Sequence, residues 1–318
     1  MPDAKKEKVI SVVGPTAAGK TSLGVQIAKA FDGEVLSADS MQIYNNMPIA
    51  SAAPTEDETD GIPHHLIGFA DPYHKFSVAE FISLASETVC DISNRGKLPV
   101  IVGGTGLYID SLISGVSFSE ENSDRVRQQL EEETKARGME SMLDELKSID
   151  PETAAKYHLN DRKRILRALE IYRIHGKTKS QLDGESKRDG DRYDCLWIGV
   201  TYRNRELLYD RINRRVDIML SQGLLDEAKK TFESNVGSTA VQAIGHKEFF
   251  PYFKGEIPLE KAVESLKAET RRYAKRQMTW FRRNEKINWI YADETPEVFK
   301  EAEQIVDNWL TERGRDNG

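Results

Sequence analysis

The chain has 318 residues, of which 39% are hydrophobic and 31% are charged, as expected for a soluble globular protein with a sizeable core. Its formal net charge of −7 argues against a general affinity for nucleic acid. No apolar run approaches the roughly 20 residues that span a bilayer, no signal peptide precedes the first strand, and the two cysteines, Cys90 and Cys195, are isolated. We interpret both cysteines as buried thiols, exclude a disulfide scaffold or a structural zinc site, and expect a cytoplasmic protein.

The first predicted elements are an apolar strand at 9–13, the segment GPTAAGKT at 14–21 and a helix at 22–31. They match the phosphate-binding pattern G-x-x-x-x-G-K-[ST] in the strand–loop–helix order that it requires. Backbone N–H groups of such a loop cradle a polyphosphate, Lys20 adds a point charge, and the Thr21 hydroxyl can ligate Mg²⁺. The segment therefore predicts a diphosphate site, and leaves open whether it holds an ATP to be split or a leaving group.

Strand and helix signals alternate through the first 115 residues. They predict a strand at 34–38, a polar connection at 45–73, a helix at 77–95 ended by Gly96, and a strand, a Gly-Gly turn and a helix in LPVIVGGTGLYI, 98–109. This alternation is typical of an α/β fold in which helices flank a parallel sheet.

A strongly helical and charged segment follows, and we interpret 116–191 as a helical insertion whose last part, 176–191, is a solvated loop. The core, 1–115 and 192–318, then resumes. Its remaining elements are predicted as a strand at 194–202, helices at 203–222, 223–235 and 259–283, a strand at 287–292 and a helix at 297–310.

Two segments are much more basic than the chain average. They are TRRYAKRQMTWFRR at 270–283, which contains no acidic residue, and DRKRILRALEIYR at 161–173. An isolated basic run is usually a solvated helix face. Two of them in an acidic protein favour local contact with a polyanion.

Asp39 ends the predicted strand at 35–39, whereas the strand at 98–102 ends in two glycines, so the acidic second strand of a P-loop ATPase is missing. An Asp at this early position can contact the acceptor in a small-molecule kinase, and with Ser40 beside it can equally cap a helix. Residue types alone leave a kinase open.

Eight blocks occur in order between about residues 9 and 290: GPTAAGKT, SADSMQIYNNMPI, PHHLI, PVIVGGTGLYI, NDRKRILRALEIY, DRINRRVDIMLSQGLLDE, AIGHKE and RRYAKRQMTWFRR. Together they resemble the tRNA dimethylallyltransferase (tRNA isopentenyltransferase) family of the bacterial type. The resemblance implies a P-loop NTPase-like core that transfers a dimethylallyl group from dimethylallyl diphosphate to the exocyclic amine of the tRNA adenosine immediately 3′ of the anticodon.

The chemistry fits these residues. Asp39 can accept the proton of a weakly nucleophilic aromatic amine, and Lys20 with Mg²⁺ can stabilise the leaving diphosphate. The resemblance also implies that Thr16 lies against the reacting groups and that Arg215 reaches the diphosphate, with Arg211 on the same helical face. The predicted diphosphate-binding set is Gly14, Pro15, Thr16, Ala17, Ala18, Gly19, Lys20, Thr21 and Arg215, with Thr21 as the metal ligand.

A larger set is implied to contact the anticodon stem-loop. It comprises Asp39, Ser40, Met41, Gln42, Thr105, Arg127, Lys163, Arg164, Arg167, Gln242, Gly245, His246, Lys247, Lys275, Arg276, Gln277, Trp280 and Arg282. The target base must leave its stack to reach the core. Trp280 and Phe281 either take part in this contact or pack the basic helix on the sheet.

The stretch ASAAP at 50–54 departs from the Gly-Thr-Ala-Lys-Pro that is common in the family, which removes one cationic contact. We interpret His64 and His65 as a packed or capping pair. Two other enzymes stay open, an adenylate (AMP or ATP) isopentenyltransferase and a P-loop kinase, and a non-catalytic RNA-binding module is disfavoured by the phosphate loop. We expect a monomer without a membrane partner.

Overall fold

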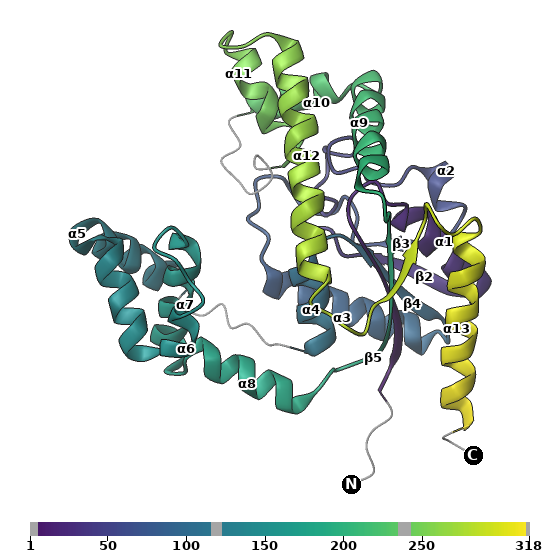
Figure 1. Cartoon of the computed structure of the whole chain (residues 1–318), viewed down its shortest axis with the longest axis horizontal. Helices are drawn as coiled ribbons and strands as arrows, with labels where there is room; N and C mark the ends of the chain where they lie inside the picture. The colour runs from purple at the N-terminus through teal and green to yellow at the C-terminus, as the bar shows by residue number, and fades with distance from the viewer. Residues whose placement is uncertain (1–5, 116–122, 235–242, 316–318) are drawn as a thin grey trace. The chain divides into compact units, whose positions relative to one another are not determined.

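The computed structural model describes residues 6–115, 123–234 and 243–315 (Figure 1). Its contacts divide the chain into two compact units, one formed by residues 1–113 and 193–318 and the other by residues 114–192. No helix among the described residues is long and apolar enough to cross a membrane.

The first unit is built on a sheet of six parallel strands in the order β3-β2-β4-β1-β5-β6. The strands are β1 (Lys8–Val13), β2 (Gly33–Ser37), β3 (His64–His65), β4 (Leu98–Gly103), β5 (Asp194–Thr201) and β6 (Asn288–Tyr291). β1 lies between β4 and β5, with Ile10 in register with both Val100 and Leu196. The order of strands therefore reverses at β1, and ligands of such sheets bind at the carboxyl end of that strand.

Helices cover both faces of the sheet, which confirms the predicted P-loop NTPase-like α/β fold (Figure 1). Alternating side chains of β1 pack toward the two helical layers. Val9 and Val13 pack toward α3 (Val78–Asn94) and α4 (Gly106–Ser114). Ile10 and Val12 pack toward α1 (Lys20–Ala30) and α13 (Val298–Arg315). α3 begins with a capping box in which Ser77 and Glu80 each bond the other's backbone N–H, as its sequence suggests.

A further helical layer follows β5. Its elements are α9 (Arg205–Ser221), α10 (Leu224–Glu233), the short helices η2 (Lys247–Phe249) and α11 (Phe250–Phe253), and the long α12 (Leu259–Phe281). Val216, Leu224, Phe249 and Leu266 form its own apolar cluster. Because α12 continues from this cluster down to the sheet, where Phe281 is buried, one helix connects the outer layer with the core (Figure 1).

The second unit contains α5 (Ser123–Ile149), α6 (Pro151–Ala154), α7 (Arg162–His175) and α8 (Lys179–Asp189) around a small core that includes Leu130, Met142 and Leu169. Gly138 interrupts α5 with a non-helical backbone conformation. The prediction of a solvated loop at 176–191 was wrong, because most of this segment forms α8. Thr178 and Gln181 form a capping box there, a start signal that the polar composition of the segment obscured.

Three smaller predictions need correction. The polar connection at 45–73 contains the short helix α2 (Glu56–Thr59) and the edge strand β3. His65 in β3 bonds the buried Glu34 carboxylate at 2.7 Å, so it is packed as a pair with a carboxylate, which the sequence did not indicate. Cys90 is exposed rather than buried because it lies on the outward side of α3, and Cys195 is half-buried.

Candidate active site

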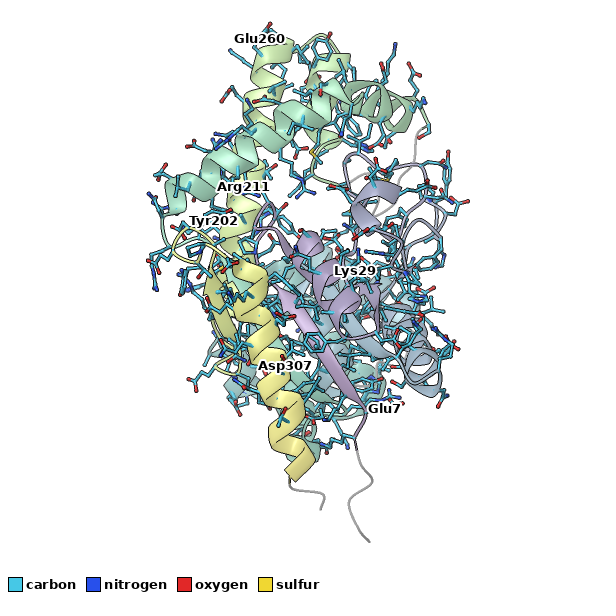
Figure 2. The ribbon with its side chains drawn as sticks, turned by 90° about the vertical axis from the view of Figure 1, so that its right-hand side faces the viewer. Glu7, Lys29, Tyr202, Arg211, Glu260 and Asp307 are labelled. Carbon is cyan, nitrogen blue, oxygen red and sulfur yellow. The ribbon has the colours of Figure 1, made fainter. Side chains whose placement is uncertain are left out.

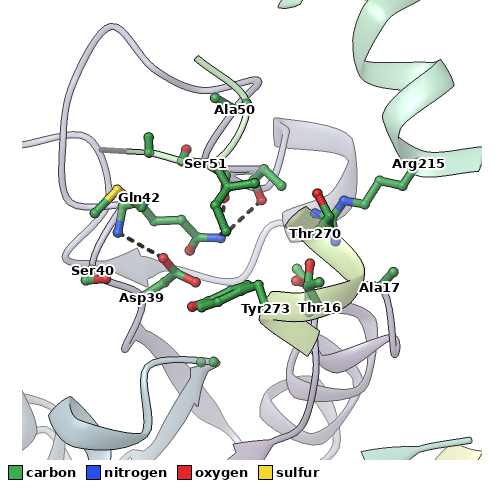
Figure 3. A pocket seen from close by; sticks show the side chains of 18 of the residues that line it. Thr16, Ala17, Asp39, Ser40, Gln42, Ala50, Ser51, Arg215, Thr270 and Tyr273 are labelled. Atoms are coloured by element: carbon green, nitrogen blue, oxygen red, sulfur yellow. Dashed lines mark hydrogen bonds between the residues drawn. The ribbon is translucent and has the colours of Figure 1, made fainter. Parts of the chain in front are cut away.

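A cavity of about 320 Å³ opens where β1, β2 and β4 end (Figure 3). The predicted site residues that line it are Thr16, Ala17, Lys20, Thr21, Asp39, Ser40, Met41, Gln42, Arg215, Gly245, Lys247, Arg276 and Gln277. Segments that are far apart in the sequence thus meet at one edge of the sheet, although the role of each residue stays a prediction. Gln242 lies outside the described residues.

The phosphate loop forms one wall of this cavity. Gly14 has a φ of 147°, and a Cβ atom there would lie 2.2 Å from the carbonyl oxygen of Val200, so only glycine lets the loop pass this close to β5. Ala17 is also left-handed, with a φ of 63°, and its carbonyl oxygen accepts a hydrogen bond of 3.0 Å from Arg211 Nε. Arg211 also lies over the ring of Tyr202 (Figure 2). Strained backbone of this kind is characteristic of functional loops.

Two cations lie at this wall: Lys20, which belongs to the phosphate loop, and Arg215 of α9. Burial lowers the pKa of Lys20 to about 8, with the Asp39 charge opposing and the Arg215 charge reinforcing the shift, and Lys20 Nζ donates to the Pro15 carbonyl at 2.8 Å. Burial likewise lowers the pKa of Arg215, which reaches from α9 toward the cavity (Figure 3). Enclosed positive charges that lack a full set of anionic partners favour an anionic ligand.

Asp39, at the end of β2, lies on the opposite side of the cavity. Its Oδ1 atom accepts a hydrogen bond of 2.9 Å from the N–H of Met41, and the residues that follow form turns rather than a helix. Asp39 therefore caps a turn, and the helix-cap interpretation was wrong. The adjacent Ser40 N–H donates to Thr105 Oγ1 at 3.0 Å, so the loops after β2 and β4 are joined.

Gln42 holds the next part of this wall. Its Oε1 atom accepts from Ser37 Oγ at 2.7 Å, and its Nε2 atom donates to the Ala52 carbonyl at 3.1 Å. Both ends of the Gln42 amide are thus bound within the protein. The segment that departs from the family pattern, residues 50–54, lies here, and Gln42 holds it through backbone carbonyl groups.

Glu227 anchors the same segment from α10, and sequence reasoning missed it. Its carboxylate accepts hydrogen bonds of 2.9 Å from the N–H groups of Ile49 and Ala50 and pairs with His246 Nε2, also at 2.9 Å. His246 has no exposed surface, so its side chain is enclosed within the protein, and its predicted contact with tRNA stays a prediction. The signal available in the sequence was weak, an acidic residue in the first turn of a helix.

α12 contributes Leu266, Thr270, Tyr273, Arg276 and Gln277 to the cavity wall. The buried Gln277 bridges the phosphate loop and the loop after β4 through its amide, and its predicted contact with tRNA stays a prediction. The ring of Tyr273, another residue missed from the sequence, lies between Asp39 and Thr16 (Figure 3). Burial and the Asp39 charge raise the pKa of its hydroxyl, against hydrogen bonds with Thr105 and Gln277, so it stays protonated.

The outer face of α12 is basic. Its exposed cations include Arg272, Lys275 and Arg276, and the exposed Arg282 and Arg283 follow directly after the helix. On the opposite face Phe281 is buried, and Trp280 packs on Gly106 and donates from Nε1 to Asp110 at 2.7 Å. Of the two alternatives for Trp280 and Phe281, the structure favours packing.

The second unit has a basic helix of its own, α7. Lys163 and Arg164 are exposed on it. Arg167 pairs with the buried carboxylate of Glu170 at 2.9 Å, and Arg127 of α5 pairs with the same carboxylate at 3.0 Å. The buried Glu170 thus holds two of the predicted tRNA contacts in fixed positions.

The model of the IPP transferase family matches residues 42–284, and that of the isopentenyl transferase family matches residues 7–67. The tRNA dimethylallyltransferase of Acetivibrio thermocellus is 47% identical over 305 residues, which cover 95% of this chain and 96% of the relative. The Bacillus subtilis tRNA dimethylallyltransferase is 46% identical over 301 residues, covering 94% and 95% of the two chains.

Solved structures give the same picture. The crystal structure of the full-length tRNA isopentenylpyrophosphate transferase of Bacillus halodurans aligns with a TM-score of 0.72 at 41% identity and covers 98% of this chain and 99% of the other. A eukaryotic dimethylallyltransferase, described as acting on tRNA, aligns with a TM-score of 0.83 at 31% identity and covers 96% and 80%.

Proposed function

Because the chain belongs to the tRNA dimethylallyltransferase family, whose members are prenyl-transferring enzymes, we propose that its donor is dimethylallyl diphosphate and its acceptor the adenosine immediately 3′ of the anticodon. The enzyme transfers a dimethylallyl group to tRNA. The similarity to these relatives supports tRNA, rather than a free adenine nucleotide, as the acceptor. It also supports alkyl transfer rather than the phosphoryl transfer of a kinase.

One observation carries the proposal for the chemistry: a single cavity is bordered by the cationic phosphate loop on one side and by Asp39 on the other. The exocyclic amine attacks C1 of the prenyl group, the N–C bond forms as the C–O bond breaks, and Asp39 accepts the proton of the amine. Diphosphate leaves with the bonding electrons. Lys20, Arg215 and the N–H groups of the loop stabilise the negative charge that develops on it.

The residues present fit Mg²⁺ as the cofactor. Among the described residues, no group of three or more His, Cys, Asp or Glu side chains is placed to hold a metal ion by itself. Mg²⁺ is usually bound by one or two protein oxygens together with substrate phosphates, and the Thr21 hydroxyl at the cavity supplies one. When bound, the ion would stabilise the negative charge that develops on the leaving diphosphate.

The basic faces of α12 and α7 support tRNA as the polyanion that both units contact. Exposed cations that can follow a phosphate backbone are Lys275 on α12, Arg282 directly after it, and Lys163 and Arg164 on α7. A mononucleotide would use far less positive surface. We propose that the enzyme acts as a monomer in the cytoplasm.

A competition of acceptors tests the proposed function. The protein is incubated with Mg²⁺ and labelled dimethylallyl diphosphate, with unmodified tRNA, AMP or ATP in separate reactions, and the products are digested and identified by mass. We expect prenyl-adenosine only with tRNA, and none with a transcript in which guanosine replaces the adenosine 3′ of the anticodon. Prenylated AMP or ATP would contradict the proposed acceptor, and ATP turnover without alkylation would contradict the proposed chemistry.

A further inference from the structure

One side-chain amide joins the two loops that follow the neighbouring strands β1 and β4 at the cavity. Gln277 Oε1 accepts a hydrogen bond of 2.9 Å from the N–H of Thr16, and Gln277 Nε2 donates one of 3.0 Å to the carbonyl of Gly104. Only 5% of Gln277 is exposed. The phosphate loop after β1 and the loop after β4 are therefore fixed relative to each other by a residue of α12, 261 and 173 positions away in the sequence.

The bridge lies beside the groups that carry the chemistry. A Cβ atom at Gly104 would lie 2.1 Å from Gln277 Nε2 and 3.7 Å from Lys20 Nζ, so the amide occupies the space that a side chain at position 104 would need. On the acceptor side, Thr105 follows Gly104 directly and accepts from the N–H of Ser40, the residue after Asp39. The same amide is thus bonded to the phosphate loop, which would bind the donor, and to the loop after β4, which lies on the acceptor side.

From this geometry we infer that Gln277 is a positioning residue, which aligns the phosphate loop with the acceptor loop and so sets the line of attack on the prenyl carbon. The inference rests on the proposed function. Both polar groups of the amide are engaged within the protein, so an apolar residue of similar shape leaves the Thr16 N–H and the Gly104 carbonyl unpaired. A small misalignment of reacting groups slows a reaction by about 100-fold without weakening the binding of either substrate.

Gln277→Met is the first test, because methionine fills a similar volume and removes both hydrogen bonds. At saturating tRNA and donor, the single-turnover rate is expected to fall about 100-fold, with the dissociation constants for tRNA and for pyrophosphate changed by less than about threefold. Gln304→Met, at an exposed position of α13, is the matched control and should behave like the wild type. A weaker binding of tRNA with an unchanged rate at saturation would overturn the inference and make Gln277 a tRNA contact.

A double-mutant cycle tests the bridge itself. Gly104→Ala places a methyl group against the amide and is expected to slow the reaction as Gln277→Ala does, because the amide must leave both partners. In the double variant the methyl group has room, so we expect no loss beyond that of Gln277→Ala alone. Independent, multiplying losses would overturn the inference. A wild-type enzyme that prenylates no tRNA would instead overturn the proposed function.

Discussion

The two walls of the cavity are built in different ways. The donor wall is one stretch of chain, 14–21, whose backbone and Lys20 come from consecutive residues between β1 and α1. The acceptor wall is a set of turns after β2 and β4 that are held by side chains from α10 and α12, among them Glu227 and Gln277. The donor wall is thus one continuous segment, which Arg211 and Gln277 also bond from distant helices, whereas the acceptor wall is assembled from separate segments by tertiary packing. Variants of the two walls should therefore fail in different ways.

The largest effect is expected from the donor wall. Lys20→Met removes an enclosed cation from the phosphate loop, and we expect kcat/KM for dimethylallyl diphosphate to fall by about 10³-fold. Steady-state kinetics with the donor varied at saturating tRNA measure it. Lys29→Met, at an exposed residue of the same helix, is the control and should retain activity. An equal loss in both variants would show that α1 tolerates no change, rather than that Lys20 binds the diphosphate.

Asp39→Asn tests the acceptor wall at its reacting group. The amide cannot accept the proton of the amine, so we expect kcat to fall by about 10²- to 10³-fold while the affinity for pyrophosphate stays the same. Single-turnover rates and equilibrium binding separate the two quantities. Asp307→Asn, at an exposed position of α13, is the control. An unchanged kcat would exclude Asp39 as the base.

The sequence predicted the donor wall better than the acceptor wall. The phosphate loop, the parallel sheet and the basic helix α12 were predictable because each has a local pattern, a motif or an apolar periodicity. Glu227 contacts Ile49 across 178 positions, and nothing in the sequence near either residue indicates that pairing. Family resemblance assigned His246 and Gln277 to tRNA, but nothing in the sequence indicates that both side chains are buried and hydrogen-bonded within the protein.

The lowered pKa of Lys20 predicts that kcat/KM for dimethylallyl diphosphate depends on pH. Its pKa of about 8 means that the free enzyme loses this positive charge as the pH rises through that value. Because kcat/KM reports ionisations of the free enzyme, kcat/KM for the donor should fall about tenfold per pH unit above about 8. The Lys20→Met variant should lack this inflection. A wild-type profile that stays flat up to about pH 10 would contradict the assignment.

Glu227→Gln is expected to have the smallest effect and to separate the walls most cleanly. An amide cannot accept from both backbone N–H groups and His246 at once, so at least one buried donor loses its partner, and we expect a loss of about 1–3 kcal/mol in the free energy of unfolding. Because Ala50, Ser51 and Ala52 line the cavity next to Gln42, KM for tRNA should rise several-fold while pyrophosphate binding is unaffected. Glu233→Gln, at the exposed end of α10, is the control.

The pH dependence of stability tests whether Glu227 anchors residues 49 and 50 through the charge of its carboxylate. Burial acts to raise the pKa of Glu227, but the hydrogen bonds from His246 and from the N–H groups of Ala50 and Ile49 hold it below its ordinary value of 4.5. The carboxylate therefore stabilises the fold above about pH 4.5, and this contribution is lost as the pH falls through its lowered pKa. The difference in melting temperature between the wild type and Glu227→Gln should narrow on acidification. A constant difference would mean that the residue anchors the acceptor wall by its shape rather than by its charge.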